Sequence, residues 1–73
     1  MTRLVPAGKI ENKIHENRTA KNLTQQELAE AVGVTRATIV ALERGDYNPS
    51  LELAFRISKF FSLKVDDLFK FKT

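Results

Sequence analysis

The chain has 73 residues, of which 42% are hydrophobic and 29% charged, and its formal net charge is +3. This length accommodates one small domain, the apolar fraction excludes a disordered chain, and the mild positive charge permits nucleic-acid binding without proving it. Because there is no cysteine and His15 is the one histidine, we expect no disulfide, metal site or cofactor. No apolar run approaches the roughly 18–20 residues of a membrane span and no signal peptide is evident, so we expect a cytoplasmic protein without membrane contact.

The N-terminal part of the chain divides into an arm and a helix. Residues 1–8 are interpreted as an N-terminal arm, with a short strand at Leu4–Val5. A first helix is predicted over residues 9–21. Ile10 and Ile14 lie four residues apart and would share one face of that helix.

Capping and stop signals delimit two further helices, at residues 25–32 and 36–44. Thr24 and Glu27 fit a capping box at the start of the first of these. Thr35 is a good N-cap for the second. The glycines that end the two helices are Gly33 and Gly45.

The C-terminal part is predicted to hold two helices and a short strand. Ser50 caps a helix over residues 51–61, whose apolar positions recur at spacings of three and four. These positions are Leu51, Ala54, Ile57 and Phe61. A short helix over residues 65–69 follows, and it is expected to fray because Lys64 is not a capping residue. The tail, residues 70–73, continues an alternation of apolar and charged residues that is typical of a strand.

Residues 25–44 are the most informative stretch. Two short helices flank a turn at Gly33, and the small Ala29 lies where the two helices would cross. The residues predicted to point into a common core are Leu28, Val34, Ile39 and Leu42. This pattern predicts a helix-turn-helix, in which the second helix enters the major groove of DNA.

Five segments of the sequence, taken together, match the sequence pattern of one protein family. They are LTQQELA at Leu23–Ala29, VGVTR at Val32–Arg36, Ile39 with LERG at Leu42–Gly45, NPSLELA at Asn48–Ala54 and VDDLF at Val65–Phe69. With these motifs the sequence resembles the Xre-like, Cro/C1-repressor type helix-turn-helix family over roughly residues 10–70. The resemblance implies an all-α, five-helix, lambda-repressor-like DNA-binding domain at residues 9–69, to which the composition of the chain ends adds short terminal strands.

The resemblance also implies roles for individual residues, with double-stranded DNA as the partner. The residues expected to contact bases are Thr35, Arg36, Ala37, Val40 and Ala41. The residues expected to contact the DNA backbone are Thr24, Gln25, Arg44, Tyr47 and Asn48. Arg18 and Glu43 look like the structural ion pair of the family, which sets the orientation of the base-contacting helix. The alternative for this pair is a partly buried contact of little net stability.

Departures from the family pattern affect two regions. Asn17 stands where the family usually has Leu, and a buried Asn needs hydrogen-bond partners. Ala37, Val40 and Ala41 are apolar where polar residues are frequent, which favours contacts with thymine methyl groups and readout of DNA shape. Arg36 remains as the one long polar side chain, and on a helix outside this motif we would interpret it as a solvated surface residue.

Five phenylalanines cluster in the last nineteen residues: Phe55, Phe60, Phe61, Phe69 and Phe71. A domain of this size hides about three of them, so we expect an exposed patch that mediates dimerisation. We assign that role to Phe60, Phe69 and Phe71, with Phe69 nearest the core. The tail around Phe71 is expected to pair with the same tail of a second chain or with the Leu4–Val5 arm.

These observations predict a sequence-specific DNA-binding transcriptional regulator, a dimeric repressor that occludes a promoter by binding a palindromic operator. The alternative is a protein-interaction module or antitoxin whose Phe-rich C-terminal region binds a partner protein. An enzyme is disfavoured, because the sequence has no cysteine, one histidine without a partner and no phosphate-binding glycine loop.

Overall fold

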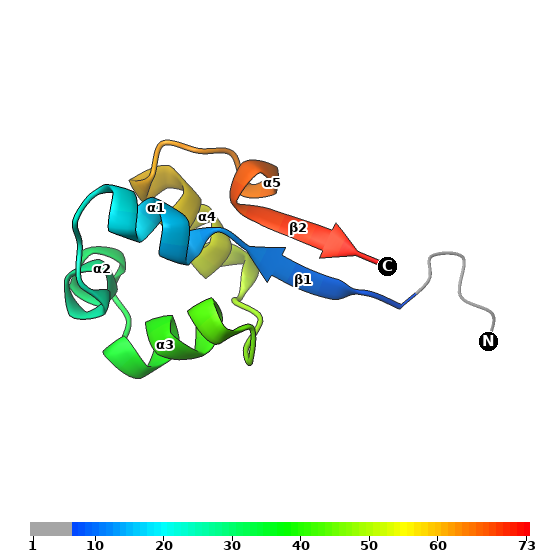
Figure 1. Cartoon of the computed structure of the whole chain (residues 1–73), viewed down its shortest axis with the longest axis horizontal. Helices are drawn as coiled ribbons and strands as arrows, with labels where there is room; N and C mark the ends of the chain where they lie inside the picture. Colours follow the sequence, from blue (N-terminus) through cyan, green and yellow to red (C-terminus); the bar gives the residue numbers. More distant parts are fainter. Residues whose placement is uncertain (1–6) are drawn as a thin grey trace.

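A computed structural model describes residues 7–73 as five helices framed by two short strands (Figure 1). The elements in chain order are β1 (Lys9–Asn12), α1 (Ile14–Ala20), α2 (Gln25–Val32), α3 (Arg36–Arg44), α4 (Leu51–Phe60), α5 (Val65–Leu68) and β2 (Phe69–Lys72). The expected five-helix architecture with short strands is confirmed. No helix among the described residues is long and apolar enough to cross a membrane.

The first helix is shorter than predicted, because Lys9–Asn12 form β1 and pair antiparallel with β2. The alternation of charged and apolar residues in β1 suits a strand, and it places Ile10 opposite Phe71 in the ladder. The expectation that Ile10 and Ile14 share a helix face is therefore wrong. The tail does form a strand, but its partner is β1. The strand predicted at residues 4–5 lies outside the described residues.

Asn12 joins the two-stranded ribbon to the helices. Its side-chain Oδ1 accepts a hydrogen bond at 3.1 Å from the backbone N–H of Ile14, the first residue of α1, whose N-cap Lys13 provides no side-chain bond. Its Nδ2 donates to the backbone carbonyl of Leu42 in α3 at 2.9 Å. One side chain thus fixes where β1 ends, where α1 begins and how both lie against the end of α3.

The predicted helix boundaries in the middle of the chain are confirmed. The Thr24 hydroxyl accepts from the backbone N–H of Glu27 at 3.0 Å, and the Glu27 carboxylate accepts from that of Thr24 at 2.9 Å, completing the capping box. Thr35 and Ser50 cap α3 and α4 in the same way. Lys64 provides no side-chain cap, and α5 is one short turn of four residues.

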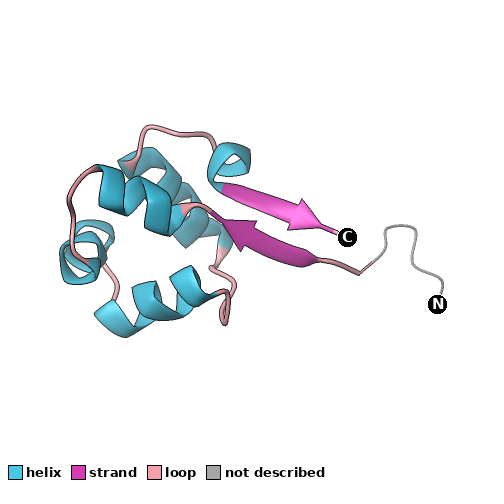
Figure 2. Ribbon diagram, in the orientation of Figure 1, coloured by secondary structure: helices cyan, strands magenta, loops and turns pink. Residues whose placement is uncertain are grey.

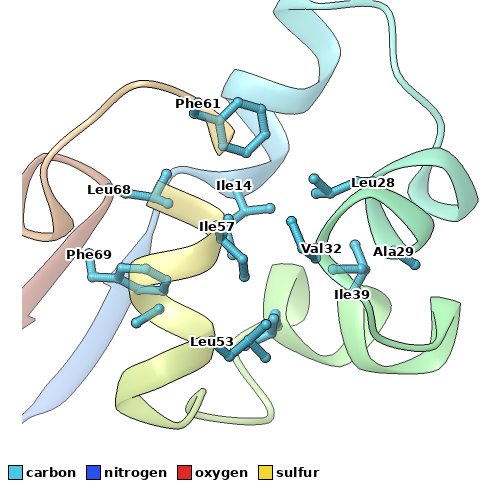
Figure 3. Close-up of a cluster of buried hydrophobic side chains, with 12 residues drawn as sticks. Ile14, Leu28, Ala29, Val32, Ile39, Leu53, Ile57, Phe61, Leu68 and Phe69 are labelled. Carbon is cyan, nitrogen blue, oxygen red and sulfur yellow. The ribbon is translucent and has the colours of Figure 1, made fainter. Parts of the chain in front are cut away.

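The core gathers around α4, which contributes Leu53 and Ile57 to a cluster that also draws on α1, α2, α3 and α5 (Figure 3). Ala54, Ile57 and Phe61 are buried as predicted, but Leu51 is 72% exposed. Leu53 takes the inward place instead, because the buried side of α4 begins two residues later than the spacing suggested. Leu51 at the first helical position therefore points to solvent.

Asn17 is only half-buried, so the expected problem of a buried amide does not arise. Its Nδ2 donates to the backbone carbonyl of Lys13 at 2.8 Å, one turn earlier. Among the described residues, no buried side-chain nitrogen or oxygen lacks a hydrogen-bond partner. The polar replacement in α1 is therefore accommodated at the surface of the helix.

The role of Asn12 gives a testable prediction. Asn12→Ala removes the hydrogen bond to the Ile14 N–H at the start of α1 and the bond to the Leu42 carbonyl, so the free energy of unfolding should fall by about 1–3 kcal/mol. Glu11→Ala is the matched control, because the Glu11 carboxylate pairs with Lys72 at 3.6 Å on an exposed face and should contribute less than about 1 kcal/mol. Urea denaturation followed by circular dichroism measures both. Equal losses for the two variants would contradict the role given to Asn12.

Candidate nucleic-acid interface

The angle between α2 and α3 is set by a tight turn. Gly33 adopts a left-handed backbone with φ of 78°, and the backbone N–H of Val34 donates to the Ala29 carbonyl at 3.0 Å. Ala29 is fully buried at this position. From α4, the Arg56 guanidinium donates to the Val32 carbonyl and so satisfies the end of α2. Sequence reasoning missed Arg56, because nothing local relates it to a carbonyl 24 residues earlier.

A buried ion pair attaches α3 to α1. The Nε of Arg18 donates to Glu43 Oε2 at 2.6 Å, and its Nη2 donates to Oε1 at 3.1 Å. The remaining Nη1 donates to the Leu23 carbonyl at 2.7 Å. The side chains of Arg18 and Glu43 are only 11% and 6% exposed. The structure thus brings together the two residues that the sequence paired.

Two further residues complete what we call the Glu43 cluster: His15, Arg18, Gln25 and Glu43. The Nε2 of Gln25 donates to Glu43 Oε1 at 3.3 Å, and His15 Nδ1 lies 3.2 Å from the same oxygen. One carboxylate on α3 therefore binds side chains from α1 and from the first position of α2. The sequence indicated no partner for His15; its side chain is 61% exposed, yet its ring reaches the cluster.

The cluster sets the charge state of its members. Burial raises the pKa of Glu43, but hydrogen bonds from Arg18, His15 and Gln25 outweigh it and hold that pKa below its usual value. The hydrogen bond from Glu43 raises the pKa of Arg18, against the opposing effect of burial. Both groups are therefore charged at neutral pH.

The outward side of α3 is free of other elements of the described chain, as α3 lies along one edge of the molecule (Figure 1). Thr35, Arg36 and Ala37 are exposed, whereas Val40 and Ala41 are half-buried. Ile39 and Leu42 on the opposite side are fully buried. Within residues 7–73, Arg36 has no ion-pair partner. Arg36, Ala37, Val40 and Ala41 thus share one side of α3, and Thr35 precedes them as the N-cap of the helix.

Thr35 has a structural task in addition to its candidate role. Its hydroxyl oxygen accepts from the backbone N–H of Thr38 at 3.3 Å and lies 3.1 Å from the Thr38 hydroxyl. Either hydroxyl of this pair can be the donor, and when Thr38 donates to Thr35, the Thr35 O–H can donate to a base or phosphate oxygen. Replacing Thr35 would therefore affect the start of α3 as well as any contact with DNA.

The start of α2 differs from expectation in one detail. The backbone N–H of Thr24, expected to bind phosphate, already donates to the Glu27 carboxylate. That bond, together with the bond involving the Thr24 side chain, lowers the pKa of Glu27, which is therefore ionised at neutral pH. The N–H groups of Gln25 and Gln26, in the first turn of α2, have no intrahelical acceptor and remain for a ligand.

The loop after α3 contains the other candidate backbone contacts. Tyr47 is 45% exposed, and Asn48 is exposed beside it. The Nε of Arg44 lies 3.5 Å from Asp46 Oδ2, in a pair whose side chains are 72% and 64% exposed. Such a surface pair contributes at most about 1 kcal/mol, so Arg44 can leave Asp46 for a phosphate. The sequence analysis did not predict that the Asp46 carboxylate competes with phosphate for Arg44.

The three phenylalanines assigned to dimerisation do not form one surface. Phe69 is 9% exposed and belongs to the core. Phe60, at the end of α4, packs edge-on against Phe61 with ring centroids 5.1 Å apart. Phe71 is 53% exposed on β2. Two of the five phenylalanines, Phe61 and Phe69, are buried where about three were expected.

The lowered pKa of Glu43 gives a pH-dependent prediction. A carboxylate whose pKa is lower in the folded state stabilises the fold above its ordinary pKa of about 4.3, and this contribution is lost as the pH falls through the folded-state value. Glu43→Gln should therefore lower the free energy of unfolding by about 2–3 kcal/mol at pH 7, with a difference that shrinks toward pH 3.

Glu52→Gln is the matched control for that experiment. Glu52 pairs with Arg56 at 2.6 Å, but its side chain is 76% exposed, so the same substitution should change stability by less than about 1 kcal/mol at either pH. Urea denaturation at pH 7 and pH 3 gives both values. If the free energy of unfolding lost in Glu43→Gln does not change with pH, the charge-based explanation is contradicted.

Comparisons with known proteins agree with this geometry. The helix-turn-helix family HTH_3 matches residues 14–68. The HTH-type transcriptional regulator MJ0272 of Methanocaldococcus jannaschii is 52% identical over 60 residues, which are 82% of this chain and 91% of that protein. The HTH-type transcriptional regulator YgzD of Bacillus subtilis is 50% identical over 60 residues, again 82% and 91% of the two chains.

A solved structure shows the same fold. The restriction-modification controller protein C.AhdI from Aeromonas hydrophila superposes with a TM-score of 0.67 and 31% identity, over 74% of this chain and 78% of that one. The family and these relatives consist of DNA-binding regulators rather than enzymes. The chain belongs to the Cro/C1-type helix-turn-helix family of transcriptional regulators.

Proposed function

We propose that this chain is a sequence-specific DNA-binding regulator that acts as a dimeric repressor and binds a palindromic operator through the major groove. The observation that supports this proposal best is the exposed side of α3, held in place from behind by the Glu43 cluster. The major groove of B-DNA is about 12 Å wide and admits one α-helix. The outward side chains of α3 are short apart from Arg36 and Arg44, so the helix backbone can approach the base edges closely.

The residues on this side suit a mixed form of base recognition. Arg36 near the start of α3 offers a guanidinium fork, which matches the O6 and N7 acceptors of guanine. Ala37, Val40 and Ala41 offer methyl groups to thymine methyls. Because one long polar side chain specifies few base pairs, part of the specificity is expected from the deformability of the operator.

The candidate backbone contacts flank this surface on both sides. A glutamine amide has two N–H donors, and Gln25 gives one to Glu43. The second is left for a phosphate oxygen, which the backbone N–H of Gln25 and the positive end of α2 also favour. Arg44, Tyr47 and Asn48 would bind phosphates beyond the other end of α3. Contacts of this kind fix register without selecting sequence.

We infer a dimer because the interface that one α3 helix forms with the major groove is small. Two copies related by a two-fold axis present two α3 helices to half-sites about one helical turn, roughly 34 Å, apart. Doubling the contacts raises affinity, and a palindrome mirrors the symmetry of the protein. Repression would then result from steric occlusion of a promoter by the bound dimer.

A partner protein at the C-terminal region is the second candidate function. It is favoured by the exposure of Phe55, Phe60 and Phe71, which are 57%, 37% and 53% exposed. Exposed aromatic side chains of this kind are enriched at protein interfaces. A partner there is compatible with DNA binding, because α3 lies elsewhere on the molecule.

Selection of binding sites from a random duplex library, at near-physiological salt, tests the proposal. We expect enrichment of a two-fold palindrome with half-sites about one turn apart. Enrichment of a single half-site would retain sequence-specific binding and reject the dimer. Salt-sensitive binding without any enriched sequence would reject the regulator and favour the partner-protein function.

Two arginines on α3 separate base contacts from backbone contacts. Arg36→Ala should reduce discrimination between the selected operator and a variant with one changed base pair by about 1–3 kcal/mol. Arg44→Ala, the matched control, should weaken binding to all duplexes alike and reduce the slope of log affinity against log salt by about one. Titrations by fluorescence anisotropy at several salt concentrations measure both quantities. Uniform weakening by Arg36→Ala would show that Arg36 contacts phosphate instead.

A further inference from the structure

We infer that the charged face of the strand ribbon binds the phosphate backbone of DNA beyond the end of α3. The ribbon consists of β1 and β2, and its charged face carries four exposed side chains: Lys9, Glu11, Lys70 and Lys72. Three lysines and one glutamate give the ribbon a net charge of +2, while the whole chain has +3. Most of the net charge of the chain therefore lies on this ribbon.

The register of the strand ladder separates the charged face from an apolar one. Directly opposed residues of an antiparallel pair point to the same side, and successive residues of a strand alternate between sides. Lys9 stands opposite Lys72, and Glu11 stands opposite Lys70. The alternate face includes Ile10, which packs against the core. The charged face therefore points away from the core.

Two lysines in direct opposition are unfavourable for the ribbon itself, because like charges at such positions repel. The Nζ of Lys72 lies 3.6 Å from Glu11 Oε1, but within residues 7–73 Lys9 and Lys70 have no ion-pair partner. Lysines on edge strands also discourage pairing with other chains, yet that function does not require two of them opposite each other. A bound polyanion, in contrast, compensates the repulsion.

Close packing fixes the outer end of the ribbon. A Cβ at Gly8 would collide with the Lys72 carbonyl oxygen and with the ring of Phe71, so the two chain ends approach at a distance that only glycine allows. Lys9 follows directly, and its position opposite Lys72 is thereby maintained. Because the backbone of both lysines is already ordered, binding to phosphate costs less conformational entropy than it would from a loop.

The ribbon leaves the helical body at the end of α3. The Nδ2 of Asn12 donates to the Leu42 carbonyl at 2.9 Å, which attaches β1 there. Lys9 and Glu11 line one hollow of about 270 Å³ together with Arg44, the last residue of α3. Lys9 is therefore next to a residue that we propose as a phosphate ligand, and the charged face continues that contact outward.

The direction and length of the ribbon suit a stretch of DNA backbone. α3 runs toward the ribbon, and both strands project past the helical body (Figure 1, Figure 2). The major groove is about 8.5 Å deep, so phosphates stand beside a helix that lies in it. Four strand residues cover roughly 10 Å, and each DNA strand carries one phosphate per about 3.4 Å of axis. The charged face can therefore reach about two or three phosphates.

This inference deepens the proposed function and rests on its placement of α3 in the major groove. Contacts to phosphate carry no direct sequence information, so the ribbon should contribute to the affinity for any duplex. The contribution of the ribbon is therefore measurable on random DNA as well as on a selected operator.

The first test removes two of the lysines. In the double variant Lys9→Gln with Lys72→Gln, affinity for both duplexes should fall at least about tenfold near 0.1 M salt. The slope of log affinity against log salt should decrease by about one to two. Lys59→Gln with Lys64→Gln is the matched control, because it removes the same charge from the groove between α4 and α5 and should leave the slope unchanged. Fluorescence anisotropy at several salt concentrations measures all four quantities.

The second test predicts a gain of affinity, which misfolding cannot imitate. The Glu11 carboxylate repels phosphate and pairs with Lys72, so Glu11→Gln should raise the affinity for both duplexes about three- to tenfold. Glu52→Gln is the matched control, because Glu52 is also an exposed carboxylate paired with a cation but lies on α4, and it should leave the affinity unchanged. Circular dichroism should show the same helical content in all variants, since the replaced side chains are exposed.

An unchanged salt slope in the double variant of Lys9 and Lys72 would overturn the inference, and so would an unchanged or lower affinity in Glu11→Gln. Equal losses in the control variant of Lys59 and Lys64 would also overturn it, because they would reflect net charge alone. In each case a selected palindrome would leave the proposed function standing. Ribbon effects on random duplexes without any selected sequence would support the ribbon contact and reject the sequence-specific regulator.

Discussion

The carboxylate of Glu43 is the constraint on which the DNA-facing half of the molecule depends. It lies on α3, is nearly inaccessible to solvent, and accepts hydrogen bonds from α1 through Arg18 and from α2 through Gln25. A buried carboxylate is costly unless its charge is compensated, so the three helices are restricted to arrangements that keep these donors in place. The exposed side of α3 is thereby presented at one angle relative to the start of α2.

This arrangement couples stability to the candidate contacts. Gln25 is both a member of the Glu43 cluster and a candidate phosphate ligand, so the spacing between phosphate and base contacts depends on the same carboxylate. From the core, α4 supports the turn between α2 and α3 through Arg56, and its Leu51 and Phe55 are exposed to solvent.

Local signals predicted much of this structure from the sequence. The Thr24 capping box, the caps at Thr35 and Ser50 and the left-handed glycines depend on neighbours a few residues away, and all are present. The strand at Lys9–Asn12 was missed because its partner lies about sixty residues later and four residues hold too short a pattern. Long-range bonds of Arg56 and His15 have no local signature. Leu51 was misplaced because apolar spacing alone does not fix which turn of α4 first meets the core.

We propose that the Glu43 cluster orients α3 for sequence recognition in addition to stabilising the fold. The double substitution Arg18→Met with Glu43→Met tests it most directly, because a well-packed apolar pair often matches a buried ion pair in stability. We expect a folded protein whose affinity ratio between selected operator and random duplex falls at least about tenfold, comparable to the loss of one base-pair contact. An unchanged ratio in a folded double variant would contradict it.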